Sequence, residues 1–256
     1  EPFPGEPFPG EPFPGEPFQG TAGFLVPHAA HTYSGPVAAH AFYRMAELGR
    51  PDLAVLLGPN HFELGYPLAL SPWDQWDTPL GVLTVETAMG DSLAASVREL
   101  RPDLEAHRRE HSLEVQLSFL IQLYGPSLPI LPILMADQSL GASRRLGEAL
   151  ADLLAGRSAV IIATSDFSHY VPDQKARDRD AYALSAIQAL DDEGLARVVA
   201  ERNLTMCGPG PVQVLLAACR ALGSTGARLL ACNTSGETAE RSDRVVGYAA
   251  LETVRH

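Results

Sequence analysis

The feature that most constrains this chain is the alternation of short, wholly apolar runs with segments of helical periodicity. The runs Leu53–Leu57, Ile130–Leu134 and Ala159–Ala163 have the length of strands and are aliphatic throughout, apart from one proline. Strands buried on both faces have this pattern, whereas strands with one wet face alternate polar and apolar residues. Ser34–Leu48 and Leu140–Leu154 place apolar residues at helical spacing. The alternation predicts an α/β protein with a central mixed, largely parallel sheet flanked by helices.

The other segments extend the same pattern to the end of the chain. No linker rich in Pro, Gly and Ser divides the chain after residue 20, so residues 21–256 are predicted to form one domain. The further expected strands are Phe24–Pro27, Tyr66–Leu70, Val82–Val85, Arg228–Ala231 and Val245–Leu251, and the further expected helices are Asp91–Leu100, His111–Leu123, Lys175–Leu190, Gly194–Glu201 and Val212–Leu222.

Residues 1–20 are one pentamer written four times, EPFPG three times and then EPFQG. Closely spaced prolines remove backbone donors and favour extended backbone, so neither a helix nor a central strand is expected here. We predict a low-complexity tail that is not part of the fold, and a binding motif is the alternative.

Composition excludes several classes of partner. The chain of 256 residues has 19 basic and 31 acidic residues, a net charge of −12, which repels nucleic acid and anionic membranes. The apolar runs are too short to span a bilayer, and no secretory signal is recognisable. Three cysteines without a C-x-x-C pair predict neither a disulfide framework nor a zinc knuckle. A cytoplasmic protein without nucleic-acid or membrane partners is expected.

Polar side chains follow three of the predicted strands at the point where each strand ends. His28 follows the first strand, His61 the second, and Asp166 and His169 the run at 159–163. Ligands of open α/β sheets bind beyond the carboxyl ends of the strands. The pattern therefore predicts one shared site, although a single histidine is more often structural.

Two other segments of the sequence place reactive side chains where they could join this site. His111 and Glu114 are three residues apart on an expected helical face, and Cys207 lies in a loop just before an expected helix, where the pKa of a thiol is lowered. The bland interpretation of Glu114 is an i,i+4-type surface pair. For His107 and His256 a surface position is expected. Trp76 and Tyr33 would line a pocket or pack against the edge of the core.

Two imidazoles with a thiolate suit a catalytic metal ion, which takes about three protein ligands and an open position. Iron, copper and zinc all accept imidazole, and thiolate favours softer ions. The sequence lacks a G-x-S-x-G elbow, an H-E-x-x-H pair, a phosphate-binding P-loop and a dinucleotide fingerprint. A Cys–His nucleophile pair, Cys207 with His169 or His28, stays open.

A series of motifs, in order from about residue 24 to 251, resembles the MEMO family, also called AmmeMemoRadiSam system protein B. The resemblance implies the fold of class III extradiol (LigB-like) dioxygenases. The motifs are Val26-Pro27-His28-Ala29, Tyr33-Ser34-Gly35, Leu57-Gly58-Pro59-Asn60-His61, Trp76-Asp77-Thr78-Pro79-Leu80-Gly81, Glu110-His111-Ser112-Leu113-Glu114-Val115-Gln116, Ser165-Asp166-Phe167-Ser168-His169-Tyr170, Cys207-Gly208 and Val246-Gly247-Tyr248.

The resemblance also implies roles for individual residues. His28, His61 and Cys207 would be the metal ligands, with iron or copper as the metal. His169 would be the acid–base residue, with Asp166 and His111 beside it. Radical-SAM and AMMECR-type proteins are the implied partners.

The sequence departs from the family where His-Ala-Gly-Tyr is usual and His28-Ala29-Ala30-His31 stands instead. His31 adds an imidazole that could compete as a ligand, and Ala30 puts the path of this loop in doubt. The usual N-terminal Gly-x-Phe-Tyr-Pro pattern is replaced by the pentamer repeat.

Three functions follow as hypotheses. The first is a mononuclear iron or copper redox enzyme, dioxygenase-like, acting on a small organic substrate. The second is an adaptor that binds a peptide or protein partner in the same pocket without catalysis. The third is a zinc-dependent hydrolase. Under the first, His169, Asp166 and His111 would be catalytic, and the substrate would contact Tyr33, Trp76, Glu114 and His31.

Overall fold

The computed structural model describes residues 18, 20–239 and 243–254. Its strands are β1 (Thr21–Val26), β2 (Leu53–Pro59), β3 (Leu68–Leu70), β4 (Gln75–Thr78), β5 (Gly81–Thr84), β6 (Leu100–Pro102), β7 (Ile130–Met135), β8 (Ala159–Thr164), β9 (His169–Val171), β10 (Gly226–Thr234) and β11 (Val245–Val254). Its helices are α1 (His31–Leu48), α2 (Thr87–Ser96), α3 (Leu104–His107), α4 (Glu114–Tyr124), α5 (Leu140–Leu154), α6 (Asp173–Gln188), α7 (Asp192–Glu201), α8 (Pro209–Ala221) and α9 (Gly236–Ala239).

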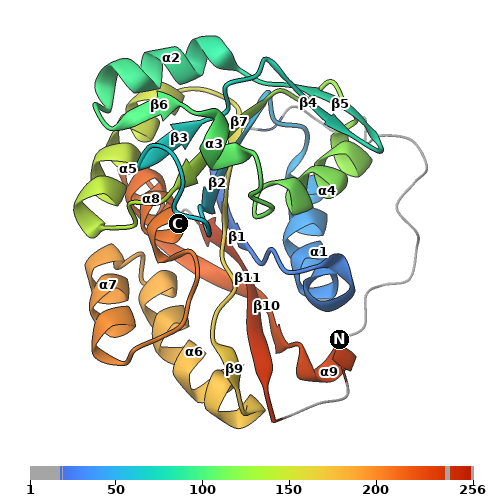
Figure 1. Cartoon of the computed structure of the whole chain (residues 1–256), viewed down its shortest axis with the longest axis vertical. Helices are drawn as coiled ribbons and strands as arrows, with labels where there is room; N and C mark the ends of the chain where they lie inside the picture. The colour runs from blue at the N-terminus through green and yellow to red at the C-terminus, as the bar shows by residue number, and fades with distance from the viewer. Residues whose placement is uncertain (1–17, 19, 240–242, 255–256) are drawn as a thin grey trace.

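One nine-stranded mixed sheet runs through the molecule (Figure 1). Its strands lie in the order β10-β11-β1-β8-β2-β7-β3-β6, and β9 pairs with β11. β1, β8, β2 and β7 are parallel to their neighbours in this series, whereas β11 and β3 are antiparallel to β1 and β7. The predicted fold class, an α/β protein with a mixed and largely parallel sheet, is confirmed.

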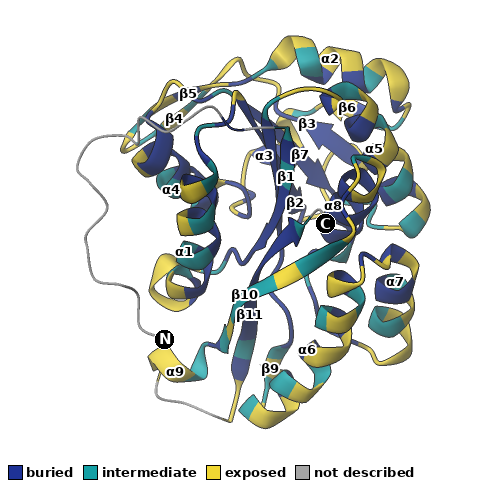
Figure 2. Ribbon diagram, turned by 180° about the vertical axis from the view of Figure 1, so that it is seen from behind, coloured by how far each residue is buried: buried dark blue, intermediate teal, exposed yellow. Residues whose placement is uncertain are grey.

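Two apolar cores cover the two faces of the sheet. Leu53, Val55 and Leu57 of β2 belong to one core, together with residues of α5, α7 and α8, while Ala54 and Leu56 belong to the other, with residues of α1 and α4. Since successive side chains of a strand point to opposite faces, a strand between two helical layers must be apolar at every position. Figure 2 shows the result, with buried strands inside and the exposed residues on the outer faces of the helices.

Three predicted elements differ from the structure. The strand expected at Val82–Val85 is β5, which pairs only with β4 in a separate two-stranded sheet. The helix expected at Asp91–Leu100 begins at Thr87 and ends at Ser96, and Leu100 belongs to β6. The helix expected from His111 begins at Glu114 instead.

Most of the pentamer repeat, residues 1–17 and 19, lies outside the described residues, so the prediction for this tail stays a prediction. Phe18 is described and is buried, and its backbone N–H donates to the Arg50 carbonyl at 3.1 Å. Among the helices of the described ranges, none is both long and apolar enough to cross a bilayer.

Candidate metal centre

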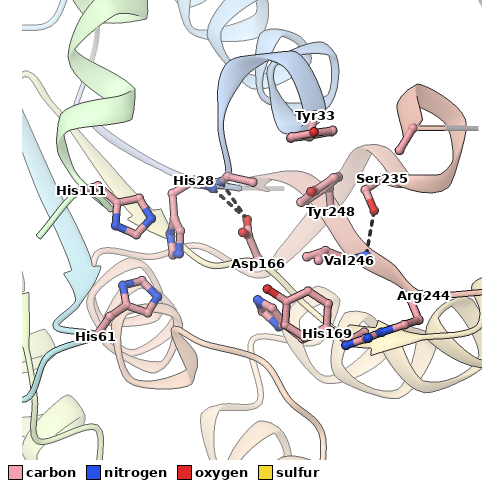
Figure 3. Close-up of a pocket in the computed structure, with 13 residues that line it drawn as sticks. His28, Tyr33, His61, His111, Asp166, His169, Ser235, Arg244, Val246 and Tyr248 are labelled. Atoms are coloured by element: carbon pink, nitrogen blue, oxygen red, sulfur yellow. Dashed lines mark hydrogen bonds between the residues drawn. The ribbon is translucent and has the colours of Figure 1, made fainter. Parts of the chain in front are cut away.

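The parallel centre of the sheet explains why distant residues meet. β1, β8 and β2 are adjacent and parallel, so their carboxyl ends lie at one edge. His28 lies two residues beyond the end of β1, Asp166 two residues beyond β8, and His61 two residues beyond β2. All three line a cavity of about 470 Å³ together with His111, His169 and Tyr33 (Figure 3). The predicted convergence of strand-end side chains is therefore present in the structure.

The three predicted ligands lie together. One potential ligand atom each from His28, His61 and Cys207 fall within 4.8 Å of one another, and Nε2 of His28 is 3.1 Å from Sγ of Cys207. Nδ1 of His28 is 2.9 Å from the Thr164 hydroxyl, which leaves Nε2 for the cluster. Burial lowers the pKa of His28 to about 4. His28 is therefore a neutral imidazole near pH 7, the form that binds metal ions.

Glu110, which the sequence analysis did not select, fixes the orientation of His61. Its buried carboxylate accepts hydrogen bonds from Nδ1 of His61 at 2.9 Å and from three backbone N–H groups, those of His61, His111 and Ser112. Burial opposes ionisation, but these hydrogen bonds, those with His61 foremost, lower the pKa of Glu110 to about 2. The carboxylate holds the proton of His61 on Nδ1 and leaves Nε2 free as a ligand.

The loop that carries Cys207 is packed against the end of β8. The backbone N–H of Asp166 donates to Sγ of Cys207 at 3.1 Å, and the N–H of Cys207 donates to the Asp166 carbonyl at 3.2 Å. A Cβ on Gly208 would lie 2.4 Å from the Thr164 carbonyl oxygen, so only glycine allows this approach.

The expected thiolate character of Cys207 is wrong for the protein without an ion. Burial, together with the negative charge of Asp166, raises the pKa of Cys207 to about 12. The side chain is a thiol at neutral pH. A coordinating ion would displace that proton, because a bound metal stabilises the thiolate directly.

Asp166 supports the first ligand. Its Oδ1 accepts hydrogen bonds from the backbone N–H groups of His28, at 2.9 Å, and Ala29, at 3.3 Å. Figure 3 shows these bonds between the strand-end loops. The carboxylate thus positions the backbone of the His28 loop, and its expected role toward His169 or a substrate stays a prediction.

His169 presents one nitrogen to the cavity. Its Nδ1 lies 2.8 Å from the Phe167 carbonyl and 2.7 Å from the Thr205 carbonyl. Carbonyl oxygens only accept hydrogen bonds, so Nδ1 carries the proton and Nε2 keeps its lone pair. This arrangement suits the predicted proton-transfer residue.

His111 reaches the site from a loop and not from a helix. Glu110 accepts the N–H groups of His111 and Ser112 and so holds the chain in a turn before α4. The rings of His61 and His111 stack with centroids 5.1 Å apart, and His61, Glu110 and His111 form a second group with potential ligand atoms within 4.8 Å. The expected pairing of His111 with Glu114 on one helical face is wrong, since Glu114 faces a different cavity.

The residues expected to contact a substrate do not all line the same cavity. Tyr33 lines the cavity beside the metal ligands, whereas Trp76 and Glu114 line a neighbouring cavity of about 430 Å³. His31 begins α1, and its Nε2 is bonded to the Val115 carbonyl at 2.9 Å, so it does not compete as a ligand here.

His107 is buried, and its expected surface position is wrong. Its Nε2 lies 3.1 Å from the Ala69 carbonyl, and Trp73 and Trp76 pack edge-on to its ring. His256 lies outside the described residues.

The fold and this site define an α/β protein that gathers two imidazoles and a thiol at the carboxyl ends of its parallel strands. The family model described as Memo-like protein matches residues 8–252. The chain belongs to the Memo family, which confirms the resemblance read from the motifs.

Relatives at substantial identity agree with this assignment. The chain is 41% identical over 231 residues to the MEMO1 family protein PAE0818 of Pyrobaculum aerophilum, covering 90% of this chain and 82% of the relative. It is 40% identical over the same length, with the same coverage, to the MEMO1 family protein MK0963 of Methanopyrus kandleri. A crystal structure of the uncharacterized protein JW3007 of Escherichia coli K12 is similar with a TM-score of 0.59. That likeness covers 90% of this chain and 98% of the other at 14% identity and concerns the fold alone.

Proposed function

We propose that His28, His61 and Cys207 hold one transition-metal ion, iron or copper, and that the site supports oxidation of a small organic substrate in the adjoining cavity. The observation that carries the proposal is the meeting of three donor atoms within 4.8 Å, with the other nitrogen of each imidazole already bonded. Two imidazoles with one sulfur are a donor set that suits both metals. A site of three protein ligands leaves a coordination position open.

The chain's own residues have separate tasks in this proposal. A bound ion would supply electron transfer and an open position for a small molecule. His169, with its proton held on Nδ1 by two carbonyl groups, accepts or returns a proton at Nε2. Glu110 keeps the His61 imidazole in one tautomer, and Thr164 bonds Nδ1 of His28 so that its Nε2 faces the cluster. Asp166 ties the loop of His28 to the loop of Cys207.

Elemental analysis of the purified full chain tests the metal assignment, with protein isolated without chelators. Wild type is expected to carry about one iron or copper ion per chain, and Cys207→Ser to lose most of it. Cys232→Ser is the matched control, because Cys232 is an exposed free thiol. Metal-free wild type, or unchanged content in Cys207→Ser, would overturn the proposal.

The metal and the co-substrate separate this function from the alternatives. Turnover that needs iron or copper and consumes oxygen supports the redox proposal. Turnover that needs zinc and proceeds without oxygen would replace it with the hydrolase. Partner capture that persists in a His28→Ala, His61→Ala double variant, without turnover, would replace it with the adaptor. The association with radical-SAM and AMMECR-type proteins stays a prediction.

A further inference from the structure

The cavity has a second end, away from the imidazoles, that the metal proposal does not use. Figure 3 shows Arg244 at the opposite end from His61 and His111, with Asp166 between them. The same cavity is lined by Tyr33, Tyr170 and Tyr248 as well. It thus has a metal-ligating end, an aromatic wall and a cationic end.

Two local irregularities of the backbone lie beside Arg244. β11 pairs with β9, and the register shifts between Val245 and Val246, directly after Arg244. On the facing strand, Tyr170 has a φ of 56°, in the left-handed region that bulky residues rarely adopt. Strained residues of this kind persist where the surrounding structure requires them, often at ligand sites.

The ring of Tyr170, the strained residue, contacts the guanidinium of Arg244. The guanidinium carbon of Arg244 lies 5.3 Å from the centroid of the Tyr170 ring, within cation–π range. Both side chains are exposed at the mouth of the cavity. A guanidinium lying along a ring face still has N–H groups free to donate to a ligand.

Arg244 has no carboxylate partner among the described residues. Within the described part of the chain, it is the only Lys or Arg that lines this cavity. The chain as a whole has a net charge of −12, a field that repels anions. A lone cation at the mouth of a cavity in such a protein favours a ligand with an anionic group.

We propose that the ligand of this cavity is a small planar organic acid whose carboxylate pairs with Arg244 and whose oxygen substituent faces His28, His61 and Cys207. A carboxylate matches the planar two-pronged donor of a guanidinium. The planar body packs against the tyrosine rings. This inference rests on the proposed metal site for its far end, whereas the carboxylate end stands on Arg244 alone.

Calorimetric titration of the full chain with 3-hydroxybenzoate and with its neutral amide, 3-hydroxybenzamide, tests the proposal. The two probes differ mainly in charge, and we expect wild type to bind the acid about tenfold more tightly. Arg244→Gln should bring the two affinities together. Arg244→Lys should keep part of the preference for the acid, because lysine keeps the positive charge but lacks the two-pronged donor geometry of a guanidinium.

Arg109→Gln is the matched control, since Arg109 is a cation of the neighbouring cavity that lies over Phe62. It should keep the tenfold preference. Equal affinities in wild type, an unchanged preference in Arg244→Gln, or an equal loss in Arg109→Gln would overturn the inference. If phenyl phosphate binds more tightly than 3-hydroxybenzoate and its binding depends on Arg244, the ligand class is a phosphate ester and the proposed carboxylate is wrong.

Metal content measured on the same samples separates the two proposals. Arg244→Gln should keep the metal content of wild type, because Arg244 is not a ligand. A metal-free wild type that still prefers the acid through Arg244 would support the carboxylate site and overturn only the metal assignment. A metal-loaded wild type without the preference would overturn only the carboxylate site.

Discussion

At the scale of single residues, the candidate site depends most on Glu110, whose buried carboxylate accepts four hydrogen bonds and holds His61 in place. Glu110→Gln keeps the shape of the side chain but removes its negative charge. The side-chain NH₂ group would then face N–H groups that are themselves donors. We expect metal affinity to fall about 10- to 100-fold, the usual effect of losing such a supporting group. A titration against a competing chelator measures the change.

Glu114→Gln provides the control for this prediction. Glu114 is an exposed carboxylate only four residues away that faces the neighbouring cavity. It should leave metal affinity unchanged, and Glu110→Gln should still give the circular dichroism of wild type. Equal affinities for wild type and a folded Glu110→Gln protein would contradict the assigned role.

The residues of the site were predictable to different degrees. His28, His61 and Cys207 stand at strand ends or before a helix, where pattern alone draws attention to them. Glu110 follows Arg108 and Arg109 in a run that looks like an ordinary charged surface. Its bond to His61 joins residues 49 positions apart, so no local signal marks it. The pKa of Cys207 was mispredicted for a related reason, because burial depends on the whole fold.

At the scale of secondary-structure elements, α5 packs closely on α8, the helix that follows the loop of Cys207. A Cβ on Gly147 would lie 2.8 Å from Cβ of Ala217 and 2.9 Å from the Val214 carbonyl oxygen. Gly147→Ala should therefore destabilise the protein by about 1 kcal/mol or more, because overpacking outweighs the gain in helix propensity. Urea unfolding followed by circular dichroism measures this.

Gly141→Ala on the same helix is the matched control. Its Cβ would meet only the end of the Arg145 side chain, at 3.4 Å. We expect its stability to be unchanged or raised by up to about 1 kcal/mol. If both variants unfold at the same urea concentration, close packing of α5 on α8 is not what requires glycine at 147.

The elements themselves were predictable where burial is two-sided. β2, β7 and β8 are apolar at nearly every position, and their central place in the sheet follows from that pattern. The run at 82–85 is equally strand-like, but its partner in the structure is β4. The composition of short exposed strands does not indicate which strand they pair with. The start of α4 was misplaced because Glu110 holds His111 and Ser112 in a turn that local propensity does not favour.

At the scale of the whole molecule, buried histidines make stability depend on pH. Burial lowers the pKa of His107 to about 4 from an ordinary value of 6.5. Below pH 6.5 the unfolded chain therefore binds a proton that the folded chain does not, and stability is lost as pH falls toward 4. Between pH 7.5 and 5.5, His107 alone should account for a loss of about 1 kcal/mol in the free energy of unfolding.

His107→Gln tests this dependence, since glutamine keeps a donor near the Ala69 carbonyl but does not titrate. The variant should lose about 1 kcal/mol less than wild type between pH 7.5 and 5.5 in urea unfolding. His31→Gln, at an exposed histidine, should follow wild type. The same pH dependence in all three proteins would contradict the role of His107.

The central claim is that one sulfur and two imidazole nitrogens meet on a single ion, and X-ray absorption spectroscopy at the edge of the bound metal tests it most directly. We predict one sulfur neighbour and, at a shorter distance, the nitrogen neighbours of two imidazoles. The sulfur contribution should vanish in Cys207→Ser and persist in Cys232→Ser. A wild-type spectrum with only nitrogen and oxygen neighbours, or one that Cys207→Ser leaves unchanged, would contradict the account.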